Sequence, residues 1–264
     1  MSLRFLSLFS LLLVVTADAA HAASTLRICA DPDNPPFSNR AGSGFDNRVA
    51  ALAARAIGRR PEFVWVRSRR GFLREQFNRN ACDVLTGVPQ GMHGVATTHA
   101  YYRSAYVFVT RAREHLRIAS FDDPHLDGRR IGLQILEEDL SPPSLPLIRS
   151  GHAAQLVGFP SFGEQAGAII RAVADGRVGA AVVWGPVAGY FAKTQPVPLA
   201  ITPVSPAVDS SGVPFVYSIS MAVHTGDSAL RDALDGALQR LQPEIQRILA
   251  EYHVPLVGGT AGAA

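Results

Sequence analysis

Charged side chains are scarce in this sequence, and neither sign dominates. Asp, Glu, Lys and Arg make up 18% of the residues, and 25 basic against 22 acidic residues give a formal net charge of +3. The basic residues are mostly arginine and are spread along the chain. Nucleic-acid-binding proteins usually gather basic residues on one face or in one stretch. The composition therefore argues against a nucleic-acid-binding protein.

Motifs of metal sites and of common catalytic centres are also absent. No H-x-H, H-E-x-x-H, C-x-x-C, G-x-S-x-G or P-loop pattern occurs. The GSGFDN of residues 42–47 lacks the last glycine of a dinucleotide-binding fingerprint. The adjacent acids of residues 137–139 cannot all face one ion on regular structure. We therefore expect neither a metal site nor an activated nucleophile, and hence a protein that is not an enzyme.

Only one long hydrophobic run is present, and it lies at the start of the chain. Arg4 is followed by an apolar run over residues 5–15 and then by small residues up to AHAA at residues 20–23. This order is typical of a secretory signal peptide, and the run is shorter than the roughly 20 residues that span a bilayer. We expect residues 1–23 to be removed near Ala22 or Ala23, leaving a periplasmic protein without membrane insertion.

Cysteine is rare as well, since the mature chain has only Cys29 and Cys82. Export to an oxidising compartment favours a disulfide between them. The expected geometry argues against this disulfide. Parallel strands would place the two Cα atoms about 10 Å apart along the strand direction, whereas a disulfide needs a distance of about 7 Å or less. The pairing of Cys29 with Cys82 stays open at this point.

The segments that are present alternate between strand and helix. This alternation occurs twice, over residues 25–110 and over residues 130–193. It is typical of parallel sheets with right-handed crossovers. The first series has predicted elements at residues 25–30, 45–56, 62–66, 71–79, 83–87 and 104–110, and the second at residues 130–135, 141–150, 154–159, 162–175, 179–184 and 185–193.

The end of the chain predicts how the two series are joined. A long strand over residues 213–223 precedes two helices. These helices must pack on a sheet face that no other helices cover. We therefore expect two α/β lobes, each a mostly parallel sheet flanked by helices, with two crossover strands near Thr110 and Phe215 as the hinge. The expected parts are lobe 1 at residues 24–110 and 216–256, lobe 2 at residues 111–215, and a disordered tail at residues 257–264.

Loops at the carboxyl ends of the strands are expected to face the cleft between the lobes, because open α/β sheets bind ligands there. The loop of residues 31–39 combines three prolines with Phe37, more than a short turn needs. Arg69 and Arg70 follow the second strand within a dense group of arginines. That group either attracts an acidic partner or forms a solvated face.

The sequence resembles type II periplasmic solute-binding proteins over nearly its whole mature length. The resemblance is carried by GFDNRVAALAARAIGRRPEFVWV, by NACDVLTGV with HAYYRSAYVFVT, by LDGRRIGLQ and by ADGRVGAAVV. The motifs LRICADPDNPPFSN, RRGFLR, CDVLTGVPQG, YYRSAYVFV and WGPVAGYFA resemble more narrowly the binding-protein-like component encoded beside methanol dehydrogenases that depend on pyrroloquinoline quinone (PQQ), the MoxJ/XoxJ type.

Two departures from the amino-acid-binding relatives bear on function. Those relatives carry an Arg after the third strand that pairs with the ligand's carboxylate, and this chain has no Arg between Asp83 and Tyr102. They also place an Asp at the end of a second-lobe strand, where this chain has Trp184. Each such charge-assisted bond is worth roughly 1.5–3 kcal/mol. Tight capture of a free amino acid is therefore not expected.

The resemblance implies an accessory that binds a PQQ-dependent methanol dehydrogenase, a segment of it or a cofactor in the cleft. PQQ would be a ligand of the partner or of the cleft, and a small organic ligand is a further candidate. The alternatives are an ABC-transporter receptor for a small solute and a dehydratase-like enzyme on the same fold. The expected ligand-contacting or partner-contacting residues are Asp31, Asn34, Phe37, Asn39, Arg69, Arg70, Gln90, Tyr101, Tyr102, Arg103, Gln134, Trp184 and Tyr190.

Overall fold

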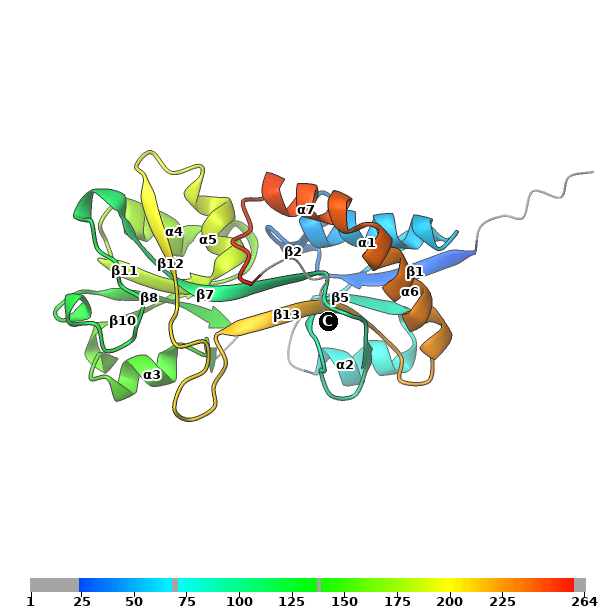
Figure 1. Ribbon diagram of the computed structural model, residues 1–264, viewed down its shortest axis with the longest axis horizontal. Coiled ribbons are helices and arrows are strands. Elements are labelled where there is room, and N and C mark those ends of the chain that lie inside the picture. The colour runs from blue at the N-terminus through cyan, green and yellow to red at the C-terminus, as the bar shows by residue number, and fades with distance from the viewer. Residues whose placement is uncertain (1–23, 68–70, 137–138, 259–264) are drawn as a thin grey trace, which may run out of the picture.

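The chain forms one long, twisted sheet that runs through two lobes, with helices on both faces of each lobe (Figure 1). This computed structural model describes residues 24–67, 71–136 and 139–258, so the segment assigned to a signal peptide lies outside the described residues. The strand order is β10-β8-β11-β7-β13-β5-β1-β4. Pairing is parallel at the two ends of this order and antiparallel in the middle. The α/β fold is the one that the sequence predicts.

The first lobe is built on the parallel strands β4, β1 and β5. Helix α1 buries Phe45, Val49 and Ala53 at helical spacing, and Gly58, with a φ of 73°, follows its end. The single helix expected over residues 71–79 is broken at Gln76, so that Phe77 turns inward and is fully buried. The elements are β1 (Thr25–Ala30), β2 (Asp33–Asn34), β3 (Ser38–Asn39), α1 (Phe45–Ala56), β4 (Arg60–Trp65), α2 (Phe72–Glu75), a 3-10 turn (Phe77–Arg79), β5 (Val84–Pro89) and β6 (Ala96–Thr97).

The second lobe repeats this arrangement on the parallel strands β10, β8 and β11. Strand β12 pairs with β7, although no strand is expected there from a segment that follows Pro198 and ends at Pro203. The elements are β7 (Tyr102–Arg111), β8 (Ile131–Leu136), β9 (Asp139–Leu140), α3 (Ser144–Arg149), β10 (Leu156–Pro160), α4 (Ala168–Ala174), β11 (Ala180–Trp184), α5 (Gly185–Ala192) and β12 (Leu199–Pro203). The chain ends with β13 (Val216–Val223), α6 (Ser228–Arg240) and α7 (Gln242–Glu251).

Strands β7 and β13 join the two lobes. Residues 102–105 of β7 pair with β13, whereas residues 106–111 pair with β11 and β12. Strand β13 also pairs with β5 in the first lobe. The partner of β7 therefore changes between Ala105 and Tyr106, ahead of the crossing expected near Thr110. The limits of the lobes given above remain a prediction.

Apolar clusters lie on both faces of the sheet in each lobe. In the first lobe α1, α6 and α7 cover one face, and Cys29, Phe77 and Cys82 lie on the other. In the second lobe α4 and α5 cover one face, and a cluster around Leu133 and Leu147 lies on the other. None of the helices in the described ranges has the length and apolar character that a membrane span requires.

Cys29 and Cys82 form a disulfide, with their Cα atoms 5.5 Å apart. The register pairs Cys29 with Leu85, so Cys82 precedes the strand residue that faces Cys29. The chain bends at residues 81–83 instead of extending β5, and this bend returns Cys82 to Cys29. The argument from strand spacing against this disulfide assumed a strand that runs straight through Cys82, and it is wrong because the chain bends there.

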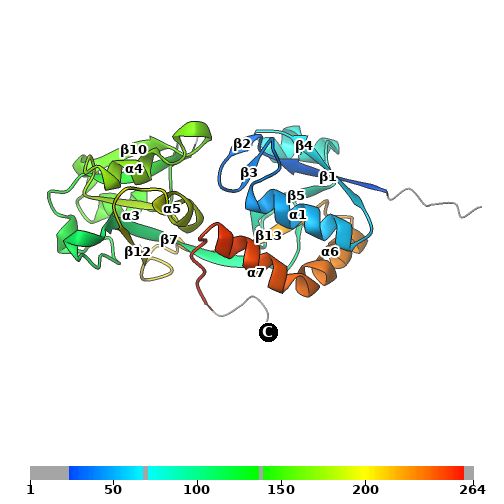
Figure 2. The same cartoon turned by 90° about the horizontal axis from the view of Figure 1, so that it is seen from above.

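The end of the chain connects the first lobe to the second. We call residues 252–257 the C-terminal strap; Figure 2 shows α7 leading towards α5 where the lobes meet. The ring of Tyr252 stacks on Tyr190 of α5, with centroids 5.6 Å apart. The Pro255 carbonyl accepts a hydrogen bond from Ser104 Oγ at 2.6 Å. Val257, expected within a disordered tail, donates its N–H to the Arg103 carbonyl at 3.1 Å.

Candidate functional site

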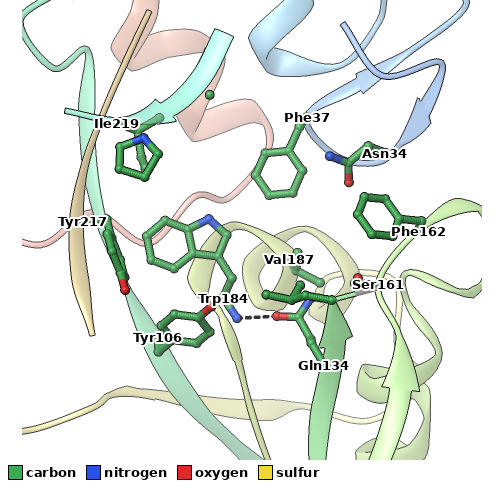
Figure 3. A pocket seen from close by; sticks show the side chains of 13 residues that line it. Asn34, Phe37, Tyr106, Gln134, Ser161, Phe162, Trp184, Val187, Tyr217 and Ile219 are labelled. Carbon is green, nitrogen blue, oxygen red and sulfur yellow. Dashed lines mark hydrogen bonds between the residues drawn. The ribbon is translucent and has the colours of Figure 1, made fainter. Parts of the chain in front are cut away.

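A pocket of about 350 Å³ lies between the lobes, where β7 and β13 cross from one to the other (Figure 3). The first lobe contributes the loop after β1 and the end of β5, and the second lobe contributes the ends of β8, β10 and β11 and the start of α5. The described lining residues are Asn34, Phe37, Gly87, Pro89, Tyr106, Gln134, Leu136, Ser161, Phe162, Trp184, Val187, Tyr217 and Ile219.

Aromatic rings form one wall of the pocket. Trp184 lies 5.4 Å from Tyr106 and 5.8 Å from Tyr217, measured between ring centroids, and both pairs are steeply inclined. Figure 3 shows Trp184 beside both tyrosines, with Phe37 on the opposite side of the pocket. Burial raises the pKa of Tyr106 and of Tyr217, so both hydroxyls are neutral at physiological pH. The wall is apolar and uncharged.

Phe37 is held in place by the loop that the three prolines shape. The Phe37 N–H donates to the Asn34 carbonyl at 2.9 Å, and the Phe37 carbonyl accepts from the N–H of Asp46 at 3.0 Å in the first turn of α1. The loop thus supplies acceptors that the start of α1 requires. The Phe37 ring lies 5.3 Å from Phe45 and also packs against the second-lobe cluster. Phe37 therefore packs between the two lobes, and only part of its ring is exposed to the pocket.

Polar groups in the pocket are few. Gln134 Oε1 accepts a hydrogen bond from the Trp184 backbone N–H at 2.9 Å, and Ser161 Oγ donates to the Ile135 carbonyl at 2.7 Å. No Asp, Glu, Lys, Arg or His occurs among the described lining residues. Within the same described ranges, no group of three or more His, Cys, Asp or Glu side chains is placed to hold a metal ion. The arrangement suits binding of a neutral, largely apolar group.

The structure brings together four of the residues expected at the site, namely Asn34, Phe37, Gln134 and Trp184. Trp184 is half-buried and packs against clusters of both lobes, so it lines the pocket and also contributes to the core. Arg69 and Arg70 lie outside the described residues. Their proposed role in attracting an acidic partner remains a prediction.

Tyr101 and Tyr102 belong to the core of the first lobe and do not line the pocket. Their exposed fractions are 0% and 2%. The Tyr101 hydroxyl donates to Asp46 Oδ1 at 2.5 Å, and the Tyr102 ring packs edge-on against Phe45. The Tyr101 N–H donates a hydrogen bond to the Ile219 carbonyl, and this bond fixes the segment of residues 101–102 against β13. Both rings therefore pack under α1.

The other expected residues also lie away from the pocket. Asp31 is buried and accepts the Asp33 N–H, and Asn39 holds a turn by bonding Ser43. Gln90 and Arg103 are exposed, and Tyr190 faces the C-terminal strap. Asp31, Asn39 and Gln90 lie at or just after strand ends, whereas Arg103 lies within β7 and Tyr190 within α5.

Sequence reasoning missed the residues that the crossover strands supply. Tyr106 on β7 and Tyr217 and Ile219 on β13 lie inside strands, where side chains are normally covered by helices. They reach the pocket because the helix layers stop where the lobes meet. The signal that points to them is a pair of aromatic residues on the two strands expected to cross between the lobes.

Known proteins with a similar sequence and a similar fold identify the family of this chain. The profile of bacterial extracellular solute-binding proteins, family 3, matches residues 26–255. Protein MoxJ of Methylorubrum extorquens is 32% identical over 263 residues, which cover 92% of this chain and 86% of that protein. The crystal structure of MxaJ from Methlophaga aminisulfidivorans MPT superposes with a TM-score of 0.77 at 30% identity, covering 88% of this chain and all of MxaJ.

The crystal structure of the periplasmic binding protein XoxJ from Methylobacterium extorquens AM1 superposes with a TM-score of 0.70 at 31% identity, covering 89% of this chain and 100% of XoxJ. The similarity therefore extends over the two lobes and the crossover strands. This chain belongs to the bacterial extracellular solute-binding proteins of family 3 and is of the MoxJ/XoxJ type.

Proposed function

We propose that the protein is a periplasmic, non-catalytic accessory of a PQQ-dependent methanol dehydrogenase. In this role it receives an apolar segment of the dehydrogenase in the pocket between its lobes and supports assembly or activation of that enzyme. The observation that carries the proposal is the uncharged aromatic lining of the pocket, in a chain similar to MoxJ, MxaJ and XoxJ. Export with removal of residues 1–23 is part of the same proposal.

The lining favours a protein segment over the other ligands considered. A free amino acid brings two charges into the pocket, and PQQ brings three carboxylates. Each buried ion costs several kcal/mol unless an opposite charge pairs with it, and the described lining residues offer no such charge. Apolar and aromatic side chains of a protein segment pay no such penalty and gain from burial against Trp184 and Phe37. PQQ is therefore assigned to the partner and not to this pocket.

Capture of the dehydrogenase by the immobilised mature protein tests this function. Leu136 lines the pocket and is 38% exposed, so Leu136→Asp places a carboxylate at the pocket without emptying a core. Losing a central apolar contact of an interface typically costs about 2 kcal/mol or more, which is roughly thirtyfold in affinity, and an unpaired carboxylate buried against the bound segment adds to that cost. We expect Leu136→Asp to weaken capture by about that factor, as measured by surface plasmon resonance with purified PQQ-dependent methanol dehydrogenase.

Leu145→Asp is the matched control. Leu145 is an exposed leucine of the same lobe, 52% exposed on α3, and it does not line the pocket. It should leave capture unchanged. Equal losses in both variants, or no loss in either, would exclude the pocket as the contact surface. An absence of any capture by the unmodified protein would overturn the proposed function itself.

A further inference from the structure

We propose that the pocket recognises a neutral amide, such as the peptide group of an inserted segment, through the carboxamides of Gln134 and Asn34. The inference rests on the proposed function and names the chemical group that the site reads. It follows from the side chains that are left with free hydrogen-bonding capacity inside an otherwise apolar lining. These two side chains come from opposite lobes.

The orientation of the Gln134 carboxamide is fixed by its partner. A backbone N–H can only donate, so the Gln134 atom that lies 2.9 Å from the Trp184 nitrogen must be the oxygen. The Nε2 donor is then the free end of the group. Gln134 is only 4% exposed, and no hydrogen bond among the described residues uses its Nε2. The Nε2 atom is not among the side-chain atoms of the described residues that are both fully buried and unpartnered, so it reaches the open space of the pocket, where a bound acceptor can take its hydrogen bond.

Asn34 supplies the complementary group from the first lobe. Its backbone carbonyl is engaged by the Phe37 N–H, whereas no bond within the described residues involves its side chain. Figure 3 shows the Asn34 carboxamide directed into the pocket, beside Phe162 and across from Gln134. A carboxamide offers a donor and an acceptor in either rotamer, so Asn34 can pair with both a carbonyl and an N–H.

Together these groups match an amide better than an ion. The Gln134 Nε2 requires an acceptor such as a carbonyl oxygen, and Asn34 accepts or donates to the remaining side of the same group. A carboxylate also accepts hydrogen bonds, but it would be buried against Phe37, Phe162 and Trp184 without a counter-charge. The apolar walls then accommodate the side chain next to the amide.

Fluorescence can test this recognition directly, because the chain has only two tryptophans. In the variant Trp65→Phe, the emission comes from Trp184 in the pocket wall. The probes are N-acetyl-phenylalanine methylamide, N-acetyl-phenylalanine with its free carboxylate, and free phenylalanine. We expect the methylamide to bind at least tenfold more tightly than either charged probe.

Two variants in the same Trp65→Phe background assign the contact. Gln134→Glu keeps an oxygen for the Trp184 N–H but replaces the Nε2 donor with a second oxygen, and it should weaken methylamide binding at least tenfold. Asn34→Leu, in the short β2–β3 hairpin of the other lobe, should weaken it severalfold. Gln90→Glu adds the same charge at an exposed position outside the pocket and should leave binding unchanged.

The outcomes separate this inference from the proposed function. Equal affinity for all three probes, or unchanged affinity in both Gln134→Glu and Asn34→Leu, overturns amide recognition even where the dehydrogenase is captured. Selective binding of the methylamide together with failure to capture the dehydrogenase supports amide recognition and overturns the proposed partner. Should Gln134→Glu not fold, as judged by circular dichroism, Asn34→Leu alone decides.

Discussion

Asp46 is a carboxyl group held in the interior of the first lobe. Its exposed fraction is 3%, and its Oδ1 accepts the Tyr101 hydroxyl at 2.5 Å. Burial raises the pKa of Asp46 to about 7, and the hydrogen bond from Tyr101 opposes this rise. The folded protein therefore keeps a proton that the unfolded chain releases near pH 4.

This difference predicts a pH dependence of stability. Between about pH 4 and pH 7 the folded state binds more protons at Asp46 than the unfolded state, so the free energy of unfolding falls as the pH rises and levels off above pH 7. The loss amounts to about 4 kcal/mol at most. Asp46→Asn should remove this slope, which urea denaturation at pH 5, 6, 7 and 8 would measure.

Tyr101→Phe serves as the control, because it leaves the burial of Asp46 intact and removes only the hydrogen bond that lowers its pKa. The descending slope should then extend to higher pH. Identical slopes in the unmodified protein and in Asp46→Asn would contradict the assignment.

Residues at the ends of strands are the part of the site that sequence predicts well. Asn34 and Phe37 follow β1, and Gln134 and Trp184 lie near or at the ends of β8 and β11; parallel topology brings such positions to one cleft. Tyr101 is also next to a strand, but its direction is set by the register between its segment and β13. That register is a long-range property of the fold and cannot be read from local sequence.

The bend of the chain at Cys82 brings this residue to Cys29 of β1, and the two form a disulfide. The disulfide closes a loop with a sequence separation of 53 and packs with Phe77 beneath β1 and β5. A loop of this length lowers the entropy of the unfolded chain by an amount worth about 4 kcal/mol. The double variant Cys29→Ala/Cys82→Ala should therefore unfold at a clearly lower denaturant concentration.

The same measurement on the unmodified protein with a reducing agent gives the comparison. Both treatments should lower the free energy of unfolding by about 2–5 kcal/mol. A double variant as stable as the oxidised protein would show that the cross-link contributes nothing to stability.

Elements of five or more residues with clear periodicity are predicted from the sequence, and shorter ones are not. Strands β1, β8 and β11 and helices α1 and α5 lie close to their expected ranges. The two-residue strand β6 depends on β13, far away in the chain, and β2 pairs only with the equally short β3 of the same loop. Strand β12 escapes prediction because flanking prolines are more typical of loops, yet it serves as a partner of β7.

The C-terminal strap contacts α5 and thereby connects the two lobes, in addition to the crossover strands β7 and β13. A Cβ added to Gly189 would lie 1.8 Å from the His253 carbonyl oxygen, so only glycine fits there. Lys193 Nζ also donates to the Glu251 carbonyl at 3.3 Å. Gly189→Ala should displace the strap and destabilise the protein by about 1–3 kcal/mol.

Lys193 is the only lysine in the sequence, so its acetylation rate, measured by peptide mass spectrometry, reports on the strap. We expect faster acetylation in Gly189→Ala. Gly236→Ala, at another helical glycine where only the flexible Arg240 side chain is close, should keep both stability and acetylation rate near or above those of the unmodified protein. Similar behaviour of the two variants would contradict a strap that restrains the lobes.

The placement of β13 between β7 and β5 has a consequence for the order in which the chain can fold during its synthesis. The main core of the first lobe joins Ile28 and Phe45, made early, to Leu234 and Leu249, made near the end. Until β13, α6 and α7 have left the ribosome, the early strands lack the layer that covers them. A nascent chain of this topology stays incompletely folded until its last segment is made, which is the state in which secretory proteins pass through a membrane channel.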